Sequence, residues 1–247
     1  MRLEEKEMLK SFFVPAIFLA LMWLVKIAEL VFNIRFGFLG IHPLHLDGLL
    51  GIILSPFIHG DWQHLTANSL PILVLGAALF YFYRPVAIKV LFLTTLITGM
   101  WVWVGARESY HIGASGVIYG LSAFLLLSGF IRRDSRLMAI SLIVVFLYGS
   151  MIWGIFPELF PEKNISWESH LSGLIAGLIL AVFFRNEGPQ RRKYSWELEV
   201  EDVTTKEEDL IEQQADSEEI PPSQKPYWDI PEPNRDDLTV VYHFKKK

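Results

Sequence analysis

Long apolar stretches are the feature that most limits how this chain can fold. An α-helix that crosses the hydrocarbon layer of a membrane needs about 20 predominantly apolar residues. Five stretches reach that length: Phe12–Phe32, Leu65–Tyr83, Val86–Val104, Ile112–Ile131 and Leu137–Phe156. A sixth, Trp167–Phe184, is shorter but carries no charge after Glu168. The sequence therefore predicts an all-α membrane protein with six transmembrane helices.

The segments around the first stretches have simpler interpretations. Met1–Lys10 is charged with both signs and is followed by no small-residue cleavage site, so the first stretch is expected to be a retained anchor. The apolar patch Leu46–Phe57 is too short to cross and is expected to be an interfacial or re-entrant loop. His42, His45 and Asp47 form a loose cluster in this first outer loop, which we interpret as ordinary surface.

Charge divides the chain into two parts. Of 27 acidic and 22 basic residues, 16 and 9 fall in residues 186–247, which gives that segment a net charge of −7. Residues 1–185 carry a net charge of +2. We expect a membrane domain over 1–185 and a disordered acidic cytoplasmic tail over 186–247, which could bind another protein. A nucleic-acid partner is not expected, and the lack of cysteine excludes a thiolate zinc site or a cysteine nucleophile.

Basic residues at the ends of the stretches predict the orientation. With the N-terminus in the cytoplasm, the inner flanks carry twelve Lys and Arg and the outer flanks four. This is the asymmetry of the positive-inside rule. The prediction is a multi-pass protein of the lipid bilayer with both termini in the cytoplasm.

A glycine-rich polar segment opens the fourth stretch, where a purely structural bundle needs no hydroxyl. Ser115 lies in the first turn of the expected helix, where free N–H groups and the helix dipole stabilise a developing oxyanion. Gly113 and Gly116 leave room for a substrate, and Gly116 and Gly120 form a small-residue packing face. Helix packing with an incidental serine explains this segment equally well when it is taken alone.

The sixth stretch carries a histidine above two glycines. At about 100° per residue, Gly173 and Gly177 lie on nearly the same helix face as His170. If this face packs against the glycines of the fourth stretch, His170 meets Ser115 at a similar depth and can take the serine proton. No carboxylate is placed as a third member, so we predict a Ser–His dyad. Tyr119 is expected to stack on the imidazole.

The second stretch opens with further polar residues. His64 and Asn68 are four residues apart and share a helix face. With the backbone N–H of Ser115 they would form an oxyanion hole. His59, Asp61 and His64 also offer metal ligands, but their spacing is not H-E-x-x-H and no glutamate base follows. We therefore expect neither a metal nor another cofactor.

Three motifs, on the second, fourth and sixth stretches, together resemble the rhomboid intramembrane serine proteases. They are His59-x4-His64-x3-Asn68, Gly113-Ala114-Ser115-Gly116 with Tyr119, and His170-x2-Gly173-x3-Gly177. The resemblance covers about residues 10–185.

The resemblance implies a six-helix bundle around a short central fourth helix, with a water-filled cavity open to the outside. It implies that Ser115 is the nucleophile and His170 the general base. His64, Asn68 and the Ser115 amide would form the oxyanion hole, and His59 would help to shape the cavity. The implied substrates are single-span transmembrane proteins, cleaved near the outer surface of a bacterial inner membrane.

One departure and two alternatives stay open. Many relatives carry a Trp-Arg pair in the first outer loop, whereas here no Trp precedes Arg35, which leaves the anchoring of this loop undetermined. A catalytically silent rhomboid-like protein that binds membrane clients is the main alternative. A proton relay or transporter built on His59, His64 and His170 lacks the buried carboxylates expected of one.

Overall fold

The computed structural model describes residues 3–147 and 166–188, all within the compact unit Met1–Arg192. The helices of the described residues are α1 (Leu3–Ser11), α2 (Phe13–Phe32), η1 (Phe36–Leu39), η2 (Leu46–Leu49), α3 (Gly51–Leu54), η3 (Ser55–Phe57), α4 (Trp62–Phe82), α5 (Ala87–Gly105), α6 (Ser115–Arg132), α7 (Ser135–Leu147) and α9 (Trp167–Phe183). The β pairing within this part of the chain is one antiparallel bridge between Ile41 and His111.

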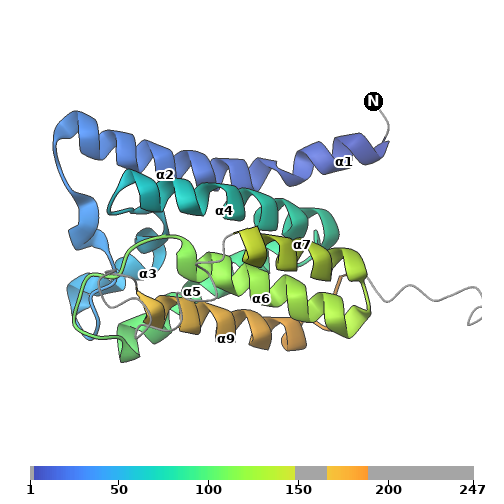
Figure 1. The fold of residues 1–247 in the computed structure, drawn as a ribbon. Coiled ribbons are helices and arrows are strands. Elements are labelled where there is room, and N and C mark those ends of the chain that lie inside the picture. The colour runs from blue at the N-terminus through green and yellow to red at the C-terminus, as the bar shows by residue number, and fades with distance from the viewer. Residues whose placement is uncertain (1–2, 148–165, 189–247) are drawn as a thin grey trace, which may run out of the picture. The chain divides into compact units, whose positions relative to one another are not determined.

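Helix α6 is the centre of the bundle. Figure 1 shows α2 beside α4, and α6 between α4 and α9. Of the α6 span, 72% is buried by protein, against 17% of the span that contains α2. Small residues on α6 allow other helices to approach it on several sides, whereas α2 leaves most of its apolar surface for lipid.

The apolar helices agree with a membrane bundle. Within the described residues, four helices are long and apolar enough to cross: Glu5–Phe32, Trp62–Phe82, Ala87–Gly105 and Ser115–Arg132. The expected sixth span is the shorter apolar helix Trp167–Phe183. Of the expected fifth span, the part up to Leu147 is helical as α7, and the remainder lies outside the described residues.

Two helices begin at residues that the hydropathy pattern did not indicate. Helix α4 starts at Trp62, three residues before the apolar stretch, because the Asp61 carboxylate caps it by accepting from the His64 N–H at 2.7 Å. Helix α6 starts at Ser115 and not at Ile112, because Gly113 has a φ of +109° and interrupts the helix.

The predicted interfacial patch is helical but does not cross. Residues 46–57 form η2, α3 and η3 in succession, a series of short turns. Gly51 lies against the backbone of Gly40, and a Cβ on Gly99 would come within 2.8 Å of the Ile52 side chain. The patch therefore lies against the C-terminal half of α5.

Glycines bring α6 and α9 into backbone contact. A Cβ on Gly173 would overlap the carbonyl oxygen of Gly116, and a Cβ on Gly177 would overlap that of Gly120. Such an approach maximises van der Waals contact between helices where lipid provides no hydrophobic force for their association. The predicted packing of the two glycine faces is therefore present.

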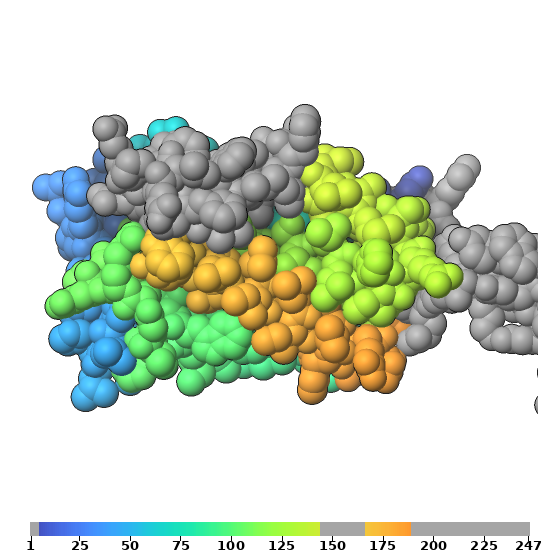
Figure 2. Space-filling model, turned by 60° about the horizontal axis from the view of Figure 1, so that its bottom comes forward, coloured from blue at the N-terminus to red at the C-terminus, as the bar shows by residue number. Residues whose placement is uncertain are grey.

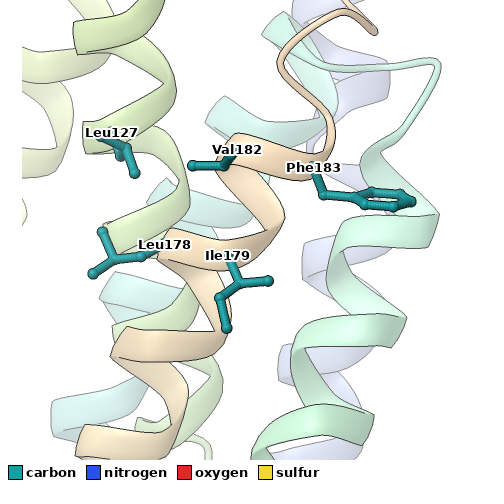
Figure 3. Close-up of a pocket in the computed structure, with 5 residues that line it drawn as sticks. All are labelled: Leu127, Leu178, Ile179, Val182 and Phe183. Atoms are coloured by element: carbon teal, nitrogen blue, oxygen red, sulfur yellow. The ribbon is translucent and has the colours of Figure 1, made fainter.

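The outer face of α9 is apolar. Figure 2 shows this helix, in orange, along one face of the molecule. A shallow groove on it is lined by Leu127 of α6 with Leu178, Ile179, Val182 and Phe183 of α9 (Figure 3). Leu127 lies about 18 Å along α6 from Ser115 at the usual rise per residue, so the groove is remote from the polar end of the helix.

A buried arginine joins α6 to the other end of α9. The Nη2 atom of Arg132 donates to the carbonyl oxygens of Phe184 at 2.8 Å, Arg185 at 3.1 Å and Glu187 at 2.6 Å. Its guanidinium also lies over the Tyr83 ring, 5.0 Å from the centroid. These contacts satisfy carbonyls that the helix end leaves unpaired, and they reach two residues past the domain boundary expected at 185.

The α6–α9 contact yields a stability prediction. Gly173→Ala is expected to lower the free energy of unfolding by about 1–3 kcal/mol or more, because the methyl group would overlap the Gly116 carbonyl. Equilibrium unfolding in detergent micelles measures the change. Gly105→Ala is the matched control, since its Cβ meets nothing within 4 Å. Equal stability of the two variants would contradict the packing argument.

Candidate active site

Ser115 and His170 form a hydrogen-bonded pair. Ser115 is the first residue of α6, and His170 lies in the first turn of α9. Their Oγ and Nε2 atoms are 2.8 Å apart. The imidazole is 7% exposed and the serine is half-buried, so a ligand can reach the hydroxyl while the histidine is held in protein. This distance allows direct proton transfer between the two groups.

An aromatic ring fixes the plane of the imidazole. Tyr119 lies one turn along α6 from Ser115, and its ring stacks on that of His170 with centroids 4.2 Å apart and planes 12° apart. Both residues are buried. The stacking predicted from the sequence is present, and it restricts the rotation that would move Nε2 away from Ser115.

Gly113 allows a second histidine to approach the serine. Gly113 has a left-handed backbone conformation and, as a glycine, no side chain. A Cβ added to it would lie 2.8 Å from Nε2 of His64. The His64 ring therefore packs against Gly113, two residues before Ser115. His64 is half-buried at the start of α4, with its backbone N–H capped by Asp61.

Asn68 carries a buried donor. It lies one turn after His64 on α4 and is 6% exposed. Its Nδ2 atom makes no hydrogen bond to any residue that the structure describes. An unpaired amide donor inside a membrane bundle is costly unless a ligand or water accepts from it. Asn68 can therefore donate to a ligand or a water that enters the site.

His59 lies between α4 and the start of α6. Its ring contacts that of His64 edge-on, with centroids 5.0 Å apart, and its Nε2 is 3.5 Å from the Ala114 nitrogen. The side chain is 1% exposed. Burial, with the nearby His64 as a smaller cause, lowers the pKa of His59 from 6.5 to about 3, so its ring is neutral at neutral pH. A neutral ring can accept the Ala114 N–H.

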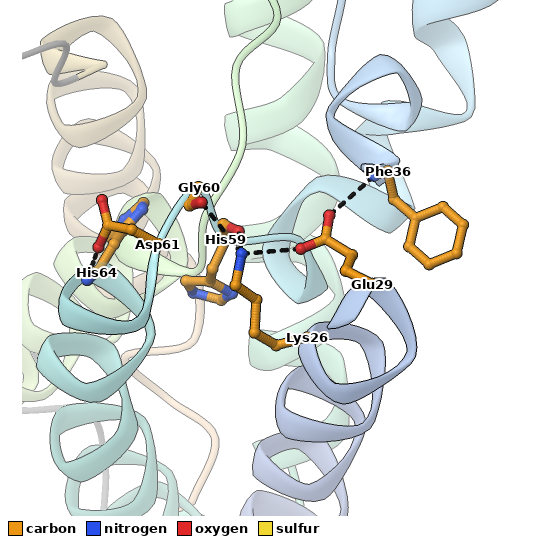
Figure 4. Close-up of polar contacts among 7 residues, drawn as sticks. All are labelled: Lys26, Glu29, Phe36, His59, Gly60, Asp61 and His64. Atoms are coloured by element: carbon orange, nitrogen blue, oxygen red, sulfur yellow. Dashed lines mark hydrogen bonds and ion pairs between the residues drawn. The ribbon is translucent and has the colours of Figure 1, made fainter. Parts of the chain in front are cut away.

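Lys26, which the sequence analysis did not single out, connects α2 to the segment that directly precedes α4. The Lys26 ammonium donates to the carbonyls of His59 at 2.8 Å and Gly60 at 3.0 Å, and pairs with the Glu29 carboxylate at 2.8 Å. Glu29 in turn accepts from the Phe36 N–H at 2.8 Å. Figure 4 shows the Lys26 ammonium between the Glu29 carboxylate and the chain at His59 and Gly60. This network anchors both ends of the segment between α2 and α4 without a Trp-Arg pair.

Another connection that was not predicted holds the start of α9. Ser166 caps the helix, accepting from the Ser169 N–H at 3.3 Å, and its Oγ is 2.6 Å from Nδ1 of His111. Glu168 is buried and pairs with Arg107 at 3.5 Å. Its carboxylate is directed at this arginine. The sequence contained a cue only in His111, which directly precedes the fourth stretch.

The geometry agrees with a family comparison. The Rhomboid domain model matches residues 46–187 of this chain. The chain belongs to the rhomboid family. It is a multi-pass integral membrane protein with the helical fold of intramembrane proteases of that family.

Its relatives include several proteins of undetermined function. An uncharacterized protein of Mycobacterium tuberculosis is 38% identical over 186 residues, which covers 71% of this chain and 75% of the relative. One from Mycobacterium leprae is 37% identical over 184 residues, covering 71% of each chain. A protein of Acanthamoeba polyphaga mimivirus that bears the rhomboid name is 28% identical over 143 residues, covering 55% of this chain and 75% of its own length.

The lowered pKa of His59 predicts an acid-sensitive stability. Below pH 6.5 an unfolded chain protonates this histidine, whereas the folded protein does not until about pH 3. Stability is therefore complete above pH 6.5 and falls by up to about 1.4 kcal/mol per pH unit as the pH drops toward 3. Unfolding in micelles from pH 7 to 4 measures this slope. His59→Phe should reduce it, whereas His243→Phe in the tail should not. Equal slopes would show that His59 is not the cause.

Proposed function

We propose that this rhomboid is an intramembrane serine endopeptidase that cleaves single-span transmembrane substrates near the outer membrane surface. The observation that carries the proposal is the 2.8 Å hydrogen bond between Ser115 and His170, with the imidazole stacked on Tyr119. A packing serine needs no histidine at this distance, and a structural histidine needs no partner that is open to a ligand.

The chemistry follows from these two side chains. Ser115 Oγ attacks the scissile carbonyl carbon while His170 Nε2 takes the hydroxyl proton. Collapse of the tetrahedral intermediate breaks the C–N bond, and the imidazolium gives its proton to the departing amine. Water then attacks the acyl-enzyme with His170 again as base, which releases the new carboxyl group and restores the serine.

Three donors are available for the oxyanion. The N–H of Ser115 belongs to the first turn of α6, where helical N–H groups have no intrahelical partner. Asn68 Nδ2 is buried and unpaired among the described residues. His64 lies against Gly113, beside the same turn. Preorganised donors of this kind stabilise the charge that develops in the transition state. His59 and Lys26 hold the loop that brings these groups together.

The membrane arrangement supplies the substrate class. We propose six spans with both termini in the cytoplasm of a bacterial inner membrane, which puts Ser115 and His170 toward the outer leaflet. A transmembrane helix hides its peptide bonds in its own hydrogen bonds, so a substrate has to unwind at the cleavage point. Residues 186–247 are proposed as a separate cytoplasmic tail that binds another protein and takes no part in the chemistry.

Removal of the serine tests the proposal directly. Ser115→Ala should abolish both labelling by a fluorophosphonate and cleavage of a reconstituted single-span substrate. Ser122→Ala, a buried serine on the same helix, is the matched control and should retain both. Cleavage or labelling that persists in Ser115→Ala would refute the proposal. A wild-type protein that cleaves no substrate but retains a membrane client would instead indicate the silent, client-binding alternative.

Asn68 provides a second test, of the oxyanion hole. Asn68→Ala should lower kcat by about 10²–10³, with little change in KM, because the donor acts only on the oxyanion. Thr66→Ala, exposed on the same helix, is the control and should leave kcat unchanged. An Asn68→Ala enzyme with normal kcat would remove this residue from the proposed site, although the serine and histidine would be unaffected.

A further inference from the structure

Outside the candidate active site, three metal-ligating side chains converge on the outer surface. Ligand atoms of His42, His45 and Glu108 all lie within 4.8 Å of one another. The histidines belong to the first outer loop, and Glu108 belongs to the loop between α5 and α6. His45 and Glu108 are exposed and His42 is half-buried, so an ion in solution can reach them.

The backbone holds the two histidines in place. Leu44, between them, has a φ of +61° and donates its N–H to the Trp103 carbonyl at 2.9 Å. The Trp103 indole donates to the His45 carbonyl, also at 2.9 Å. The two imidazole rings are stacked, with centroids 3.9 Å apart and planes 5° apart. The backbone that carries the two histidines is therefore fixed to the end of α5.

An acidic residue orients one of the ligands. Asp47 Oδ2 is 3.3 Å from Nδ1 of His42 and 3.4 Å from the Tyr110 hydroxyl. A carboxylate that binds one ring nitrogen of a histidine directs the other nitrogen to a metal, an arrangement typical of zinc sites. This leaves Nε2 of His42 as the ligand atom.

We propose that His42, His45 and Glu108 bind a divalent transition-metal ion of the Zn²⁺ class, with Asp47 orienting His42. Two imidazoles and one carboxylate supply three ligands of a tetrahedral site, and water supplies the fourth. Zinc–ligand distances of about 2.0–2.1 Å require ligand atoms about 3.3 Å apart. Because an imidazole nitrogen binds a metal in the plane of its ring, the exposed His45 side chain has to turn out of its stack on His42 when the ion binds. The exposed Glu108 side chain can rotate to close the remaining gap.

Such an ion would join two loops that lead to the active site. The first outer loop pairs with the second at Ile41 and His111, through two hydrogen bonds of 2.9 Å. The second loop ends at Gly113 and Ala114, directly before Ser115. Metal binding at this position would stabilise the folded arrangement of both loops, because the ion binds a geometry that the unfolded chain lacks.

The test uses the full-length protein without a histidine tag, stripped of metal by a chelator. Titration calorimetry with Zn²⁺ should detect one tight site, and Co²⁺ should give the visible absorption of a tetrahedral ion. Zn²⁺ should also raise the unfolding temperature. Asp47→Asn should weaken Zn²⁺ binding about 10–100-fold. His45→Ala and Glu108→Gln should weaken it at least as much and remove the Co²⁺ absorption.

Two controls separate this site from the other histidines. His170→Ala and His243→Ala should retain wild-type affinity for Zn²⁺. Unfolding of each variant without metal checks that its fold is intact, and the near-isosteric Glu108→Gln provides the result if His45→Ala is unstable. Wild-type affinity in Glu108→Gln and His45→Ala, or loss of binding in His170→Ala, would overturn the proposal.

Discussion

The approach of α6 to α9 without intervening side chains is the constraint on which the rest of the site depends. At Gly173 and Gly177 the space of a Cβ is occupied by a carbonyl oxygen of the neighbouring helix. The separation of the helices therefore depends on main-chain atoms, which vary little in position. The serine and the histidine sit in the first turn of each helix, so their distance follows from this contact. The distance between Ser115 and His170 thus depends on four glycines, Gly116, Gly120, Gly173 and Gly177, that have no side chain.

Much of this arrangement can be predicted from the sequence. The relation of Ser115 to Tyr119, and of His170 to Gly173, is a matter of residues on one face of a helix, which spacing determines. The first residues of α4 and α6 were harder to predict from the sequence. The capping role of Asp61 and the left-handed backbone of Gly113 are local features, but hydropathy is insensitive to both. Lys26 was missed for a different reason, since its partners at His59 and Gly60 are far away in sequence.

The half-buried Lys26 and the buried Arg132 are balanced by backbone carbonyls as much as by opposite charges. Lys26 contacts two carbonyls in addition to Glu29, and Arg132 contacts three at the end of α9. Main-chain oxygens that loops and helix ends leave unpaired would be costly in a membrane. Each cation satisfies several of them, and in doing so it joins elements that are distant in the chain.

Arg132 also has a mechanical consequence. Helices α6 and α9 are fixed at one end by the serine–histidine bond, along their length by glycine contacts and at the other end by this guanidinium. Two helices that are joined at three levels move together. In the proposed peptidase, a substrate would therefore enter by displacement of the elements around this pair, with Ser115 and His170 already aligned before it arrives.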